Sequence, residues 1–123
     1  MDTRSKILSL TEAAVLPGPL AMVTGYFDIL RAEHIHELGE LQRRSGAAKL
    51  LAVVLPVSGE YLTQGARGEL VAALRMIDYV VTADDADAGR LTDLLKPVET
   101  VRLEAADIRR ARELKEHVHR RQA

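Results

Sequence analysis

A short segment of the chain combines residue types that bind phosphate with the start of a predicted helix. Main-chain N–H groups at a helix N-terminus, together with the helix dipole, form a site for an anion. An arginine in the same segment can bind phosphate through two parallel hydrogen bonds. The segment that contains Gly25, Tyr26, Phe27, Asp28, Arg31 and His34 is therefore predicted to form a phosphate-binding loop.

The elements around this loop follow an α/β pattern, in which short apolar runs alternate with amphipathic stretches. Strands are predicted at 20–24, 50–55, 78–82 and 98–103, and helices at 34–44, 69–76, 86–95 and 105–121. The run 50–55 is apolar throughout, which is typical of a central parallel strand. The pattern predicts a Rossmann-like three-layer α/β sandwich with a parallel sheet of about four or five strands.

Length and composition are those of one small globular domain. The chain has 123 residues, of which 47% are hydrophobic and 28% are charged, and its net charge is −1. We assign 1–123 to a single domain, with 1–19 as an N-terminal lead-in and 104–123 as a C-terminal helix. Because the net charge is close to zero, the chain has no excess of positive charge that would indicate binding to nucleic acid or to an anionic membrane.

Cysteine is absent, which excludes disulfides and thiol chemistry and favours a cytoplasmic protein. No apolar stretch reaches transmembrane length, and 1–14 does not have the pattern of a signal peptide. The histidine pairs 34/36 and 117/119 are spaced two apart, so on a helix they point to different sides and do not predict a metal site.

Three segments resemble one family. Residues 25–34 (GYFDILRAEH) are similar to the signature G-x-F-D-[LI]-[LF]-H-x-G-H of the cytidylyltransferase-like nucleotidyltransferase superfamily. Residues 6–13 (KILSLTEA) and 67–81 (RGELVAALRMIDYVV) resemble segments of the D-glycero-β-D-manno-heptose-1-phosphate adenylyltransferase domain of ADP-heptose synthase. The resemblance covers roughly residues 6–97 and implies the same fold.

The resemblance also implies roles for individual residues. His34 matches the second signature histidine, which in the family donates to the nucleotide phosphates and stabilises the leaving pyrophosphate. Arg67 matches an arginine before the second helix, which places it in the nucleotide site. The alternatives are a helix-capping or partly buried histidine and an ordinary arginine at a helix start. Asp28 can instead fix the turn as an Asx-turn does, and Phe27 can anchor the core.

The departures from the signature concern the residues that carry charge. Arg31 replaces the first histidine and Glu33 replaces the glycine, so a carboxylate lies where the family places phosphates. No lysine occurs between Lys49 and Lys96, and the family's late phosphate-binding loop has no counterpart. Arg31 can bind phosphate in place of the histidine or be a solvated loop residue. These departures leave enzyme activity open.

Three functions follow as hypotheses. The first is a pseudoenzyme of the nucleotidyltransferase fold that retains at most nucleotide or sugar-phosphate binding. The second is an active transferase that uses Arg31, His34 and Arg67, with Mg²⁺ accompanying the nucleotide and no tightly bound cofactor. The third is a structural or interaction domain. A homodimer is expected, with an interface at 58–65 and the following helix.

Overall fold

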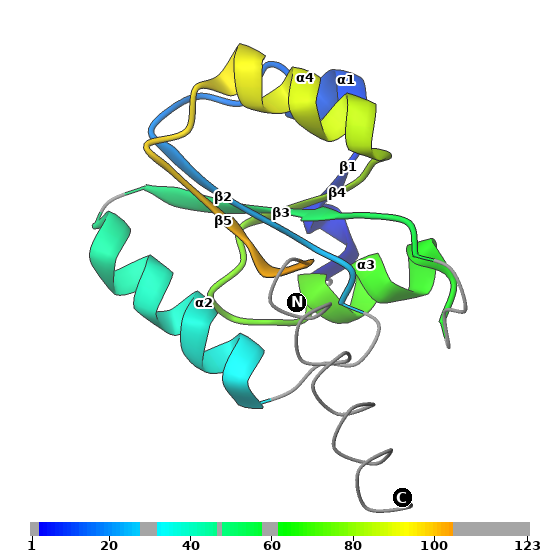
Figure 1. Ribbon diagram of the computed structural model, residues 1–123, viewed down its shortest axis with the longest axis horizontal. Helices are drawn as coiled ribbons and strands as arrows, with labels where there is room; N and C mark the ends of the chain where they lie inside the picture. The colour runs from blue at the N-terminus through cyan, green and yellow to red at the C-terminus, as the bar shows by residue number, and fades with distance from the viewer. Residues whose placement is uncertain (1–2, 28–31, 47, 58–61, 105–123) are drawn as a thin grey trace, which may run out of the picture.

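The computed structural model describes residues 3–27, 32–46, 48–57 and 62–104 (Figure 1). A five-stranded parallel sheet forms the centre of the fold, in the order β1-β4-β3-β2-β5. Its strands are β1 (Ile7–Leu8), β2 (Leu20–Gly25), β3 (Lys49–Val54), β4 (Tyr79–Thr82) and β5 (Glu99–Arg102).

Helices cover both faces of the sheet. Figure 1 shows α1 (Leu10–Ala13) and α4 (Asp85–Leu95) over one face, with α2 (Ala32–Ser45) and α3 (Gln64–Ala72) over the other. A 3₁₀ turn, η1 (Thr3–Lys6), precedes β1. The predicted Rossmann-like three-layer sandwich is therefore confirmed.

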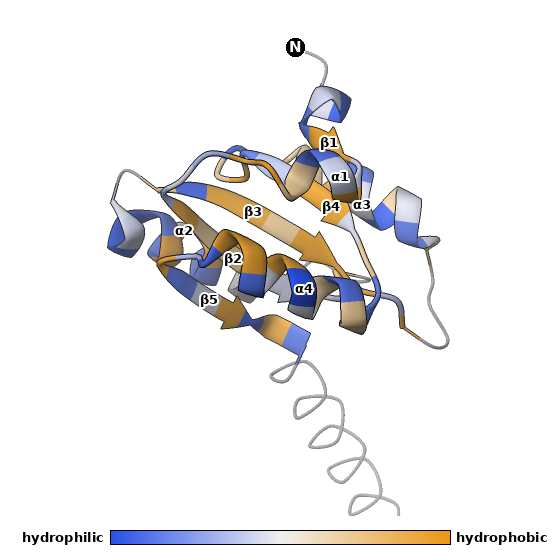
Figure 2. Ribbon diagram, turned by 90° about the horizontal axis from the view of Figure 1, so that it is seen from above, coloured by the Kyte–Doolittle hydropathy of each residue, from blue (hydrophilic) through white to orange (hydrophobic). Residues whose placement is uncertain are grey.

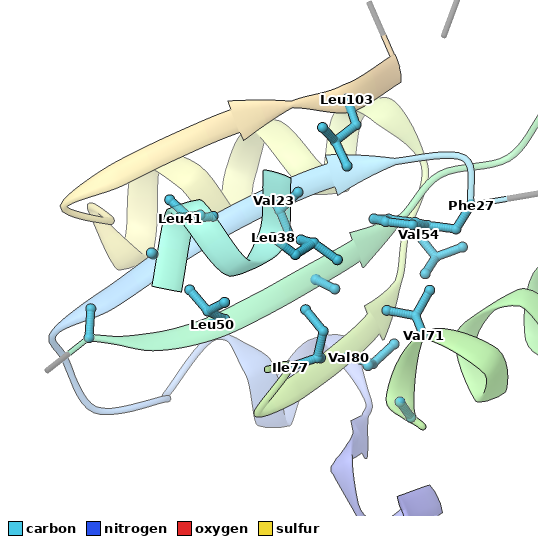
Figure 3. Packing of buried hydrophobic residues seen from close by; sticks show 14 residues of the cluster. Val23, Phe27, Leu38, Leu41, Leu50, Val54, Val71, Ile77, Val80 and Leu103 are labelled. Carbon is cyan, nitrogen blue, oxygen red and sulfur yellow. The ribbon is translucent and has the colours of Figure 1, made fainter. Parts of the chain in front are cut away.

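Two apolar cores separate the layers because the side chains of a strand alternate between the two faces of the sheet. On the α2–α3 face, the core includes Val23, Phe27, Leu38, Val54 and Leu103 (Figure 3). On the α4 face, a second core is built from Ala13, Met22, Leu51, Val53, Leu55, Val81, Ala83, Ala88 and Leu91. Figure 2 shows the strands mainly apolar, with polar residues on the outward sides of the helices.

The element boundaries differ most from the sequence prediction in the lead-in and at α3, which ends at Ala72 and not at residue 76. The lead-in contributes the edge strand β1, which pairs Ile7 with Val80 and Leu8 with Val81. A strand of two residues is too short to show an alternating pattern. Helix α3 begins at Gln64 because the Thr63 side chain accepts the Ala66 N–H at 3.1 Å and caps the helix. The prediction missed this cap and began the helix at residue 69.

Other predictions agree with the structure or lie outside its described part. The helix predicted at 86–95 is α4, and the Asp84 carboxylate caps it by accepting the Asp87 N–H at 2.7 Å. The predicted helix 105–121 and residues 58–61 of the predicted dimer segment lie outside the described residues. Within the described residues, no helix combines the length and apolar character needed to cross a membrane.

We predict that Gly25→Ala destabilises the fold. A Cβ at this position would lie 3.0 Å from Cε2 and 3.1 Å from Cζ of the buried Phe27 ring. Such overpacking costs about 1–3 kcal/mol. Urea unfolding should show this loss, whereas Gly65→Ala, where a Cβ meets nothing within 4 Å, should not lower stability. Equal stability of the two variants would contradict the packing role of Gly25.

Candidate functional site

The order of the strands places a ligand crevice beside the carboxyl end of β2. From β2 the chain adds β3 and then β4 on one side, and later returns to add β5 on the other side. Open parallel sheets bind ligands outside the carboxyl ends of the strands at such a reversal. Thr24 of β2 is in register with Arg102 of β5, so these residues mark the crevice.

The predicted loop begins directly at this point. Gly25 is buried as the last residue of β2, and its carbonyl accepts the Leu55 N–H at 2.9 Å. Tyr26 is half-buried against the core on the α4 face. Phe27 has a left-handed φ of 53°, and its ring lies in the opposite core with 2% exposure. Phe27 therefore has the position of a core anchor.

His34 lies in the first turn of α2, on the side of the helix that faces the sheet. It shares that side with Leu38 and Leu41, which follow at helical spacing and are buried in the core. His34 itself is only 3% exposed, whereas His36 is exposed. The histidine predicted to contact phosphate is thus a buried residue at a helix start.

The Arg67 side chain is fully buried and points toward the main chain of two loops. Its Nη1 donates to the carbonyl oxygens of Tyr26 at 2.6 Å and Leu55 at 2.7 Å, and its Nε donates to that of Leu62 at 3.3 Å. These carbonyls follow β2 and β3, where the ladder hydrogen bonds end. With 0% exposure, Arg67 has the geometry of a residue that fixes the loops around the crevice.

Gln64, like Arg67, donates hydrogen bonds to main-chain carbonyls at the carboxyl ends of strands. Its Nε2 donates to the carbonyl oxygens of Val54 at 2.9 Å and Ala83 at 3.2 Å, at the ends of β3 and β4. Gln64 and Arg67 both lie in the first turns of α3. The start of this helix therefore ties together the carboxyl ends of three strands.

A polar cavity of about 250 Å³ opens on the α4 side of the reversal, and we call it the α4-side cavity. Within it, the Thr24 hydroxyl lies 2.8 and 3.0 Å from the two carboxylate oxygens of Glu104, to which it donates. Thr24 is only 5% exposed, so it contacts the carboxylate from the buried side of the cavity. The cavity is lined by Thr24, Leu55, Asp85, Ala88, Gly89, Thr92, Thr100, Arg102 and Glu104.

Sequence reasoning missed this cavity, although part of its signal is visible. Thr100, Arg102 and Glu104 alternate with the apolar Val101 and Leu103. A period of two at the end of a strand places polar side chains on one face. The remaining lining residues come from β2 and α4, and only the fold brings these elements to the same place.

The structure brings part of the predicted site together. Gly25, Tyr26 and Phe27 are consecutive, and Arg67 contacts the Tyr26 carbonyl. Asp28 and Arg31 lie outside the described residues. Among the residues that the structure describes, no group of three or more histidine, cysteine, aspartate or glutamate side chains could hold a metal ion.

Comparison with known proteins supports a coarse assignment. No protein-family model matches the chain, and no curated protein matches it. Its structure is similar to that of the lipopolysaccharide core biosynthesis protein from Thermoplasma volcanium GSS1, with a TM-score of 0.58. The two sequences are 27% identical, and the match covers 68% of this chain and 73% of the other. The likeness supports the α/β fold and, at the coarse level, the superfamily that the sequence resembles.

We predict that Arg67→Met lowers stability through the carbonyls that lose their donor. Each buried acceptor left without a partner costs about 1–3 kcal/mol. The free energy of unfolding from urea titration should fall by more than about 2 kcal/mol, because two short hydrogen bonds are lost. The control is Arg75→Met, at an exposed arginine. Unchanged stability together with lost nucleotide binding would instead establish Arg67 as a ligand contact.

Proposed function

We propose that this chain is a nucleotidyltransferase-fold protein with an impaired catalytic site, which retains binding of a nucleotide or sugar phosphate. One observation carries the proposal. Arg67, which the resemblance places at the nucleotide, directs its donors at the carbonyls of Tyr26, Leu55 and Leu62 and is fully buried. A cation committed to these carbonyls is poorly placed to neutralise charge on a departing pyrophosphate.

The charges available near the crevice support the same conclusion. Transfer of a nucleotidyl group requires preorganised positive charge where the phosphates develop charge. The sequence has no lysine between Lys49 and Lys96, and the described part of the α4-side cavity lining has two carboxylates and one guanidinium. These groups supply too little positive charge to stabilise a leaving pyrophosphate, but they can form hydrogen bonds to a bound ligand.

Retention of binding is supported by the fold. The signature loop directly follows β2 at the sheet reversal, and a polar cavity opens beside it. The similar structure from Thermoplasma volcanium GSS1 is a lipopolysaccharide core biosynthesis protein, which favours a sugar-containing ligand. The alternative, an active transferase that uses Arg31, His34 and Arg67, requires two residues that are 3% and 0% exposed to reach a substrate.

We predict that the protein does not turn over nucleotides. Incubated with ATP or CTP, Mg²⁺ and sugar phosphates including heptose 1-phosphate, it should release pyrophosphate no faster than a blank. Calorimetric titration with the same compounds should still show binding. Clear turnover that disappears in His34→Ala would establish the active alternative. Absence of any binding would leave only the structural or interaction domain.

We also propose a homodimer that uses residues 58–65 and the helix α3. Leu62 and Leu70 are 36% and 45% exposed in this region, so each presents apolar surface to solvent. Light scattering at micromolar concentration should give about twice the chain mass.

A Leu70→Glu variant should be a monomer, because a charge in an apolar interface is costly. The matched control is Leu94→Glu, at a 65% exposed leucine on α4, and it should remain a dimer. A monomer mass for the unmodified chain would exclude the dimer, and a monomer only for Leu94→Glu would move the interface to α4.

A further inference from the structure

The size of the α4-side cavity limits what it can hold. Pockets for whole drug-sized ligands measure roughly 300–1,000 Å³. At about 250 Å³, this cavity matches a ring-sized fragment better than a complete nucleotide. Any nucleotide or sugar phosphate that enters must therefore leave its remaining part, including its phosphates, outside the cavity.

The lining of the cavity is suited to hydroxyl groups. Of the lining residues that the structure describes, three are threonines, two are carboxylates, one is an arginine, and two, Leu55 and Ala88, have apolar side chains. Carboxylates accept hydrogen bonds, an arginine donates them, and threonine does both. The Thr92 hydroxyl is already engaged, since it donates to the Ala88 carbonyl at 3.0 Å. The carboxylates are consequently the main acceptors for an incoming group.

Glu104 is the best-positioned of these acceptors. The Thr24 hydroxyl lies 2.8 and 3.0 Å from the two oxygens of this carboxylate and holds it in place. Thr24 itself is only 5% exposed, so its position is fixed by packing. An ionised carboxylate has about four acceptor positions, of which one hydroxyl donor fills one. Two adjacent ligand hydroxyls can then each donate to one oxygen of the fixed carboxylate.

The charge of the cavity disfavours a phosphate inside it. Among the described lining residues, Asp85 and Glu104 outnumber Arg102, so these residues contribute a net negative charge. An anion would meet like charge, whereas a neutral polyol donates to the same carboxylates. The middle of α4 adds Gly89, where a Cβ would meet nothing within 4 Å, so the missing side chain leaves space beside the cavity.

We propose that the α4-side cavity binds the polyhydroxylated ring of the ligand, with vicinal hydroxyls donating to the Glu104 carboxylate that Thr24 orients. The inference rests on the proposed function, and it specifies which part of the ligand enters. The ring is the ribose of a nucleotide or the sugar of a sugar phosphate, since both present a vicinal diol.

The test is a titration of the ¹⁵N-labelled full chain followed by NMR. The probes are ATP, 2′-deoxy-ATP, glucose 1-phosphate, inorganic pyrophosphate and myo-inositol. Polyol-containing probes should shift the amides of Gly89, Thr100 and Glu104, and pyrophosphate should not. A shift by ATP that 2′-deoxy-ATP does not reproduce identifies ribose, and a shift by glucose 1-phosphate alone identifies a sugar ring.

Two variants and one control make the test decisive. Glu104→Gln keeps the shape but removes the charge, and it should weaken binding of the shifting probe about tenfold. Gly89→Leu should fill the cavity and abolish that binding while keeping the helix. The control, Asp93→Asn, removes an exposed carboxylate of α4 that does not line the cavity, and it should bind as the unmodified chain does.

Failure of this inference differs from failure of the proposed function. If nucleotide or sugar phosphate binds equally well to Glu104→Gln and Gly89→Leu, the ring lies elsewhere and the inference is overturned. If no probe shifts the cavity amides, it is overturned as well. If only myo-inositol shifts them, no nucleotide or sugar phosphate binds, and both the proposed function and the ring assignment that rests on it are overturned.

Discussion

The buried guanidinium of Arg67 is the interaction on which the carboxyl edge of the sheet depends. Parallel strands end at this edge with carbonyl groups that no neighbouring strand can satisfy, and a buried carbonyl requires a donor. Arg67 supplies donors to the carbonyls of Tyr26 and Leu55, which follow β2 and β3. Gln64 does the same for Val54 and Ala83. The loops around the crevice are therefore set by the start of α3.

This arrangement divides the carboxyl edge into two unlike sides. On the α2–α3 side, Phe27, His34 and Arg67 are all at most 3% exposed, so that side is packed. On the α4 side, the polar lining of the cavity remains accessible next to β5. Under the proposed function, a ligand at the sheet reversal would meet hydroxyls and carboxylates before it meets the buried cation. This order of contacts suits recognition of a polar ring better than chemistry on phosphates.

The sequence predicted the elements whose signal is local. The segments that form β2 and β3 are mostly apolar in sequence and almost completely buried in the structure. Asp84 is a residue type that commonly caps a helix. The start of α3 was missed because Gly65 and Gly68 weaken the helical pattern and only the Thr63 cap marks the boundary. The cavity was missed because its residues belong to β2, α4 and β5, and their proximity follows from the register of Thr24 with Arg102.

The signature loop shows why a fold can be predicted more securely than an activity. Two of the matching residues, Gly25 and Phe27, have packing roles, because Gly25 leaves room for the Phe27 ring, and that ring fills the core in a left-handed backbone conformation. Any chain that builds this strand-to-helix turn has to meet these steric demands. The residues that differ, at positions 31 and 33, are ones that would bring charge to a phosphate. Packing requires only the first set, so the fold persists whether or not the second set supports catalysis.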